Sequence, residues 1–311
     1  MLVPAASARS RRRRITGRAV APWVFLTPAL AMITGVLTIP LGYALWVSLH
    51  RQRISGGGLG VAEEVFVGLE NYVRVLARPD LLPSVGRMLM FALIFVPITL
   101  TLAWVFALML DNESTRLRRV TRIGIFIPYA VPGVIAALMW GFLYLPGVSP
   151  FHDFAAAVGT PPPDFLGAGS IVASIANIAI WGAVGFNTVI LYTALRGVPG
   201  ELYDAAKIDG CNAIQLALRI KTPLIVPGLV LTGMFTIIGS LQVFSEPNTM
   251  VLLSAAIGSD WVPMMVVYRD AFITNDLYGA SALSMLMTAA TVLASLLVFA
   301  ITRWRATRGG A

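Results

Sequence analysis

The segment ELYDAAKIDGCNAIQLALRIKTP, residues 201–223, lies between two long apolar stretches of the chain. It holds both lysines of the protein, three carboxylates and a glycine. The stretches on either side are long enough to cross a bilayer as helices, which takes about 20 apolar residues. We therefore expect this segment to be a polar connection between two membrane-spanning helices.

Composition supports a membrane protein throughout. Of 311 residues, 57% are hydrophobic and 12% are charged, and the mean hydropathy is +0.80. Soluble domains carry about 25% charged residues. Long continuous apolar runs indicate helices, since a membrane barrel would show short alternating strands. The expected fold is an all-α integral membrane protein.

Six apolar runs predict six transmembrane helices. The first is too long for the core of a signal peptide and is expected to be retained as a span. The predicted helices cover roughly residues 22–49, 87–110, 121–145, 168–194, 223–246 and 279–302.

The distribution of positive charge predicts the orientation. Seventeen of the 23 Lys and Arg residues fall in the N-terminal tail, the second loop, the fourth loop and the C-terminal tail. Positive residues concentrate on the cytoplasmic side, so both termini and residues 201–223 are expected to be cytoplasmic. The first outer loop fits less well because five of the other six positive residues cluster there: Arg51, Arg53, Arg74, Arg78 and Arg87.

Several functions are disfavoured by what the sequence lacks. Glu246 and Arg87 are the ionisable residues closest to span interiors, and both sit near span ends, which weakens a proton- or sodium-coupled carrier. Neither lysine follows a glycine, so no phosphate-binding loop of the G-x-x-x-x-G-K type exists. The single cysteine, Cys211, and the separated His50 and His152 predict no disulfide and no metal site. No catalytic cluster is found, and the net charge of +8 comes from arginines at span ends and in loops, so no nucleic-acid partner is expected.

Residues 201–223 predict two short helices. Pro199 and Gly200 should end the preceding span, and residues 201–209 read as the first short helix. Gly210 can adopt the left-handed conformation that ends a helix. A second helical piece is expected over residues 212–220, and Pro223 is expected to stop it.

Such a segment could form a knob that docks on another protein, or an amphipathic helix that lies on lipid headgroups. Small residues would allow close approach by a partner backbone, and one lysine among three acids makes a poor binder of anionic lipid. The small residues are Ala205, Ala206 and Gly210, and the polar rim is Asp204, Lys207 and Asp209.

The segment resembles the EAA loop of ABC-importer permeases. The matching residues are Asp204-Ala205-Ala206, Asp209-Gly210-Cys211, Ile220 and Pro223. Asp204, Cys211, Ala217 and Thr222 depart from the usual glutamate, alanine, aromatic and leucine. The stretches FVGLENYVRVL from Phe66, IFIPYAVPGVIAALMW from Ile125 and LYGASALSML from Leu277 are similar to sugar-uptake permeases of the maltose and glycerol-phosphate type, the inner-membrane components of binding-protein-dependent transport.

This resemblance implies a permease subunit of an ATP-driven importer in a bacterial inner membrane. It implies a second permease subunit, two copies of a cytoplasmic ATPase that bind ATP and magnesium, and an external solute-binding protein, with no cofactor on this chain. It also implies a basic tail at 1–20, a permease domain at 21–303 with a coupling loop at 199–223, and a tail at 304–311. The implied ATPase-coupling residues are Asp204, Ala205, Ala206, Lys207, Asp209, Gly210, Ile220 and Pro223.

The family places solute contacts on the two spans that flank this loop. The candidates are aromatic or neutral polar residues and a glycine: Trp181, Phe186, Asn187, Gly239, Gln242 and Phe244. Hydrogen bonding between helices and lipid or packing contacts are the alternative roles for these residues. Trp140 and Tyr144 are expected to anchor a span end at the membrane interface.

The resulting hypothesis is a permease subunit that carries a sugar or related small polar solute. The alternative is a stand-alone secondary transporter.

Overall fold

The structure is a computed structural model that describes residues 17–54, 62–112 and 118–308. Most of the tail predicted at residues 1–20, the arginine Arg116 and the last three residues lie outside the described residues. The side chains of Arg18, Arg118, Arg119, Arg305 and Arg308 are likewise not described.

The predicted spans appear as helices, and the third and the fifth of them are interrupted. Among the described residues, five helices are long and apolar enough to cross a membrane, and the bent pair α5 and α6 raises this number to six if it counts as one span. The two members of this pair make an angle of 98°. The spans are α1 (Gly17–Ile33), the π-helical turn η1 (Thr34–Thr38) and α2 (Ile39–Ser48); α4 (Leu81–Asp111); α5 (Arg118–Ala130) and α6 (Gly133–Tyr144); α8 (Ile171–Arg196); α12 (Val226–Leu241) with α13 (Ser245–Met250); and α15 (Leu277–Arg308).

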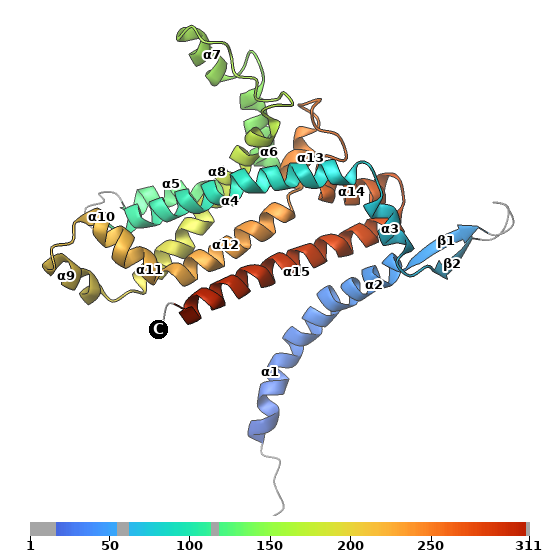
Figure 1. Cartoon of the computed structure of the whole chain (residues 1–311), viewed down its shortest axis with the longest axis horizontal. Coiled ribbons are helices and arrows are strands. Elements are labelled where there is room, and N and C mark those ends of the chain that lie inside the picture. Colours follow the sequence, from blue (N-terminus) through green and yellow to red (C-terminus); the bar gives the residue numbers. More distant parts are fainter. Residues whose placement is uncertain (1–16, 55–61, 113–117, 309–311) are drawn as a thin grey trace, which may run out of the picture.

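Shorter elements connect the spans (Figure 1). They include an antiparallel hairpin in which His50 pairs with Phe66, a feature that the sequence did not predict. The connecting elements are β1 (His50–Ile54), β2 (Ala62–Phe66), α3 (Glu70–Leu76), α7 (Pro150–Ala157), α9 (Gly200–Ile208), α10 (Ala213–Gln215), η3 (Leu216–Lys221), α11 (Thr222–Leu224), α14 (Pro263–Tyr268) and η4 (Arg269–Ile273).

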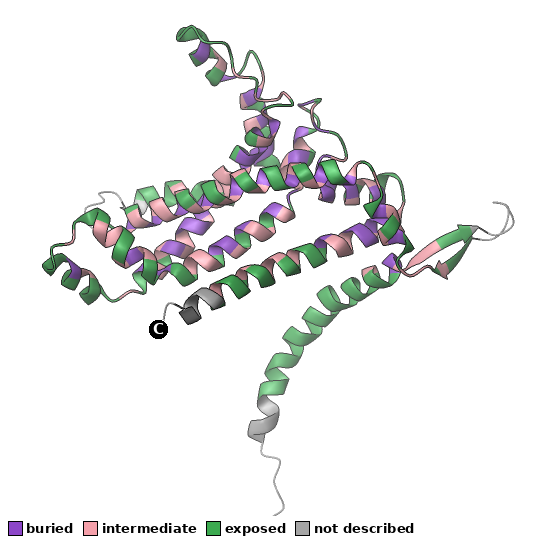
Figure 2. Cartoon of the chain, in the orientation of Figure 1, coloured by how far each residue is buried: buried purple, intermediate pink, exposed green. Residues whose placement is uncertain are grey.

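The core lies where α4 and α8 pack against each other and against α5, α6 and α12 (Figure 2). Phe91 and Phe95 stack in this core at 5.2 Å and are buried. Gly185 of α8 faces the backbone of α5, where a Cβ atom would collide with the carbonyl oxygen of Ile125. A small residue at this contact therefore sets how closely two spans approach.

The first span stands apart from this core. Figure 1 shows α1 curving away from the bundle, while α2 packs against α15. Figure 2 shows the described residues of α1 as exposed. The same figures place α9, the end of α4 and the end of α15 together at one end of the molecule.

Arginines of the first loop form ion pairs at the end of the molecule opposite α9. Arg78 binds both Asp80 and Asp270, and Arg269 binds the same two acids. The hydrogen bond from Arg78 holds the pKa of Asp80 down, at about 2, against the effect of burial. These arginines therefore join α3 and the start of α4 to α14 and η4, which gives them a structural role.

Two details of the sequence prediction are wrong. Tyr144 does not anchor a span end at an interface, because its side chain is 3% exposed and its ring stacks on Phe165 at 4.8 Å. Its hydroxyl accepts a hydrogen bond from Asn177 at 2.8 Å. Pro223 does not stop the second helical piece, since it lies inside α11, and the chain leaves helical geometry at Ile225.

Candidate functional site: an end loop and a cavity between spans

The segment at 199–223 folds as the two predicted helical pieces. Gly197 ends α8, and Pro199 precedes α9. Gly210 follows α9 with φ +85°, the left-handed region that glycine occupies without steric cost. Asn212 and Gln215 then form a reciprocal capping box that starts α10. Local sequence therefore accounts for the angle between the two pieces.

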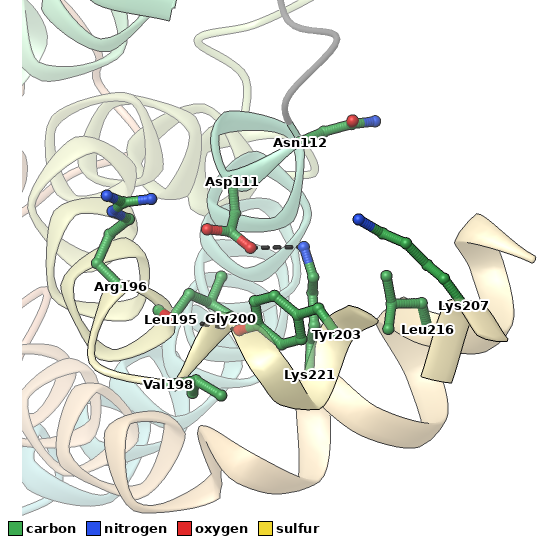
Figure 3. Close-up of a pocket in the computed structure, with 10 residues that line it drawn as sticks. All are labelled: Asp111, Asn112, Leu195, Arg196, Val198, Gly200, Tyr203, Lys207, Leu216 and Lys221. Carbon is green, nitrogen blue, oxygen red and sulfur yellow. Dashed lines mark hydrogen bonds and ion pairs between the residues drawn. The ribbon is translucent and has the colours of Figure 1, made fainter. Parts of the chain in front are cut away.

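A buried ion pair holds this segment against the membrane helices (Figure 3). Lys221 Nζ lies 2.5 Å from Asp111 Oδ2 at the end of α4, and the two side chains are 11% and 5% exposed. The ammonium also lies 4.7 Å from the centre of the Tyr203 ring. Trp104 donates a hydrogen bond to Thr222 at 3.0 Å. The loop is thus attached to α4 by an ion pair and a hydrogen bond, while the contact between Lys221 and Tyr203 lies within the loop.

The outer surface of α9 is open. Ile208 is 86% exposed and Leu202 is 46% exposed. Of the predicted coupling residues, Ala206 is buried against the chain itself and Ile220 is half-buried. The remaining ones are exposed: Asp204, Ala205, Lys207, Asp209, Gly210 and Pro223. Lys207 pairs with Asp204 at 3.2 Å on this surface. A cavity of about 660 Å³ lies behind α9, between it and the ends of α4 and α8.

A second cavity, of about 370 Å³, lies among the spans themselves. It is bounded by α4, α8 and the two breaks in helical structure, between α5 and α6 and between α12 and α13. Its lining combines aromatic, aliphatic, small and polar residues: Phe91, Phe95, Tyr129, Val131, Gly133, Ala136, Ile178, Ala179, Gly182, Ala183, Gly239, Gln242, Val243, Phe244, Ser245 and Glu246. We name it the span cavity.

The span cavity collects half of the predicted solute contacts. Gly239, Gln242 and Phe244 line it. Trp181, Phe186 and Asn187 are not among its lining residues. Asn187 is 3% exposed, donates to the carbonyl of Ala183 at 2.9 Å and accepts from Thr236 at 3.4 Å, so it joins α8 to α12.

The aromatic candidates outside the cavity pack against other rings. Phe186 stacks on Tyr129 at 4.9 Å, and Trp181 meets Trp140 edge to face at 6.1 Å. Tyr129 lines the span cavity, so Phe186 packs behind the ring of Tyr129 and does not line the cavity itself. These ring contacts correspond to the packing role that the sequence analysis gave as the alternative to solute binding.

Two residues of the candidate sites, Glu246 and Asp111, were not singled out from the sequence. Glu246 lines the span cavity, whereas its position in the sequence shows only that it is near a span end. Asp111 pairs with Lys221 across 110 residues of chain, a separation at which no local signal exists. Within the described residues, no group of three or more His, Cys, Asp or Glu side chains could hold a metal ion.

Known proteins with similar sequences are transport permeases. Residues 100–308 match the family model of the binding-protein-dependent transport system inner membrane component. The trehalose/maltose transport system permease protein MalF of Thermococcus litoralis is 31% identical over 71% of this chain and 74% of its own length. The diacetylchitobiose uptake system permease protein NgcF of Streptomyces coelicolor is 29% identical over 95% and 86%. The sn-glycerol-3-phosphate permease UgpA of Yersinia enterocolitica is 28% identical over 86% and 88%.

Solved structures show the same fold. A chain of a bacterial alginate ABC transporter, crystallised with an alginate pentasaccharide-bound periplasmic protein, superposes with a TM-score of 0.77 at 16% identity. The match covers 93% of this chain and 97% of that one. A chain of the MetNI methionine ABC transporter matches less closely, with a TM-score of 0.53 over 75% of this chain. The chain belongs to the family of binding-protein-dependent transport system inner membrane components.

Proposed function

We propose that the chain is a permease subunit of an ATP-driven importer for a sugar or a related small polar solute. The observation that carries the proposal is the loop at 199–223, which is fastened to α4 by a buried ion pair while the outer surface of α9 stays exposed. Such a loop can transmit force, since a buried ion pair and a hydrogen bond attach it to α4 and its exposed surface can receive a partner. The relatives of this chain are named as permeases for saccharides and glycerol phosphate, which supports the solute class.

The proposed partners follow from this role. A second permease subunit completes the pathway, two cytoplasmic ATPase subunits bind ATP and magnesium, and a solute-binding protein delivers the solute from outside. Both termini and α9 face the cytoplasm in this proposal, which agrees with the positive charges near α9 and with the common position of α9 and the end of α15 (Figure 1). The exposed Ile208 and Leu202 supply an apolar centre for docking, and Asp204, Lys207 and Asp209 supply its polar rim.

Co-purification with the ATPase tests the docking role. Ile208→Arg should abolish or strongly weaken recovery of the ATPase, because a charge would enter an apolar contact. The matched control is Leu252→Arg at the other end of the molecule, where the wild-type residue is 85% exposed. Full recovery of the ATPase with Ile208→Arg would exclude α9 as the docking surface.

Reconstitution tests the energy source. The complete complex should take up solute only when ATP is present. Gradient-driven uptake by this chain alone in liposomes would favour a secondary transporter.

A further inference from the structure

Glu246 is the one acidic residue that lines the span cavity within the described part of the chain, and no Lys, Arg or His lines it there. It lies in the first turn of α13, which follows the break at residues 242–244. A Cβ atom placed on Gly133, at the start of α6, would lie 3.4 Å from Glu246 Oε1. The carboxylate therefore sits where the two breaks meet.

This carboxylate has no cationic partner. No Lys, Arg or His side chain of the described residues lies within 4.0 Å of it, whereas the buried acids Asp111 and Asp270 both have such partners. It lies close to the N-terminal end of α6, whose peptide dipoles favour a negative charge. An ionisable group without a charged partner in a membrane span is costly and marks a pathway or a binding site.

The cavity around it suits a saccharide. Its volume of about 370 Å³ falls within the range of about 300–1,000 Å³ usual for small-molecule sites. Tyr129 and Phe244 offer ring surfaces, and Gln242 offers a neutral donor and acceptor. The amide and carboxylate can both accept hydrogen bonds from hydroxyl groups. An anionic solute would instead meet the carboxyl group of Glu246, and no cationic side chain among the described residues lines the cavity to offset it.

We propose that Glu246 is a specificity-determining residue, which makes the span cavity accept neutral or cationic saccharides and exclude anionic ones. This inference rests on the proposed function of the chain as a saccharide permease. The carboxylate accepts hydrogen bonds from hydroxyl or ammonium groups of the solute and repels carboxylate or phosphate groups. The N-terminal end of α6, which could otherwise bind an anion, already faces Glu246.

The test uses the complete complex in liposomes, with the solute-binding protein held constant. Uptake is measured for three disaccharides of similar size: neutral maltose, cationic chitobiose with free amines, and an anionic disaccharide of two uronic acids. In the wild type, ATP-dependent uptake of the neutral or cationic probe should exceed that of the anionic probe by at least about tenfold. Glu246→Gln should lower the favoured rate by about tenfold, the loss expected for one charge-assisted hydrogen bond.

Further variants separate specificity from structure. Glu246→Lys should raise the rate of the anionic probe relative to the other two, and Glu246→Asp should recover part of the wild-type preference. Glu63→Gln, at an exposed position on the hairpin, is the matched control and should change nothing.

The outcomes distinguish the role of Glu246 from the proposed permease function. A wild type that prefers the anionic probe, or a Glu246→Gln variant with unchanged rate and preference, would overturn the role of Glu246 and leave the permease function intact. Equal loss of all three rates would also overturn it, because that pattern indicates a structural role. ATP-dependent uptake of none of the three would contradict the proposed function itself.

Discussion

Replacing Lys221 with methionine should destabilise the protein strongly. The change removes the cation that lies 2.5 Å from Asp111, a carboxylate whose side chain is 5% exposed. At an effective dielectric of about 20, this distance corresponds to an attraction of about 7 kcal/mol, part of which is offset by the desolvation of both charges. Breaking such a pair on one side typically costs about 3–5 kcal/mol, and we expect a loss in that range.

The two lysines of the protein provide their own control. Lys207 also pairs with an aspartate, but its side chain is 52% exposed and that of Asp204 is 72% exposed. Lys207→Met should therefore cost less than about 1 kcal/mol. The double variant Asp111→Asn with Lys221→Met should recover much of the stability, because it leaves no unpaired buried charge.

The assay is the thermal midpoint of the purified protein, followed by the loss of the monodisperse peak in fluorescence-detected gel filtration. Lys221→Met should lower the midpoint by several degrees more than Lys207→Met does. Equal midpoints for the two lysine variants would refute the reasoning. So would a double variant no more stable than Lys221→Met, since the cost would then not come from the unpaired carboxylate.

Three further predictions concern other contacts and use the same thermal assay. Gly185→Ala should cost about 1–3 kcal/mol because its methyl group meets the backbone of α5, whereas Gly86→Ala in α4, with nothing within 4 Å, should be near neutral; equal midpoints would exclude the close contact. The pKa of Asp80 is lowered to about 2, so its contribution to the free energy of unfolding, about 2 kcal/mol, is complete above about pH 4 and is lost as the pH falls toward 2. An Asp80→Asn variant should lack this loss of stability between pH 4 and pH 2. The same loss in the variant would contradict the assignment to Asp80. Gly210→Ala should cost about 1 kcal/mol because φ is +85°, while Gly200→Ala should not; the reverse order would argue against the left-handed turn.

The spans and the loop were predictable because their signals are local. A run of apolar residues specifies a membrane helix, and the sequence placed the ends of α8, α12 and α15 within six residues of their observed bounds. Gly210 likewise marks the end of α9 by its own conformational freedom. In both cases the residues that determine the structure are neighbours in the chain.

The features that were missed depend on distant partners. Tyr144 looks like an interface residue in sequence, but Phe165 and Asn177 enclose it. Asp111 acquires its role only when Lys221 is brought beside it by folding. The proline-rich third span could be recognised, yet the 98° angle between α5 and α6 is seen only in the folded chain, where both pieces pack against α8. The position of Glu246 in a cavity could not be recognised from the sequence for the same reason, because residues of four spans line that cavity.

The two breaks in the spans have a consequence for affinity. Where helices stop inside an apolar layer, peptide groups lose their internal partners and must be satisfied by neighbouring protein or by water in a cavity. We therefore expect the pocket at the junction of α5, α6, α12 and α13 to be wet before a cargo molecule arrives. Each hydroxyl that enters would then replace a solvent contact of similar strength, and the net gain would be small. Such weak binding would let the solute dissociate on the opposite side of the membrane as readily as it bound.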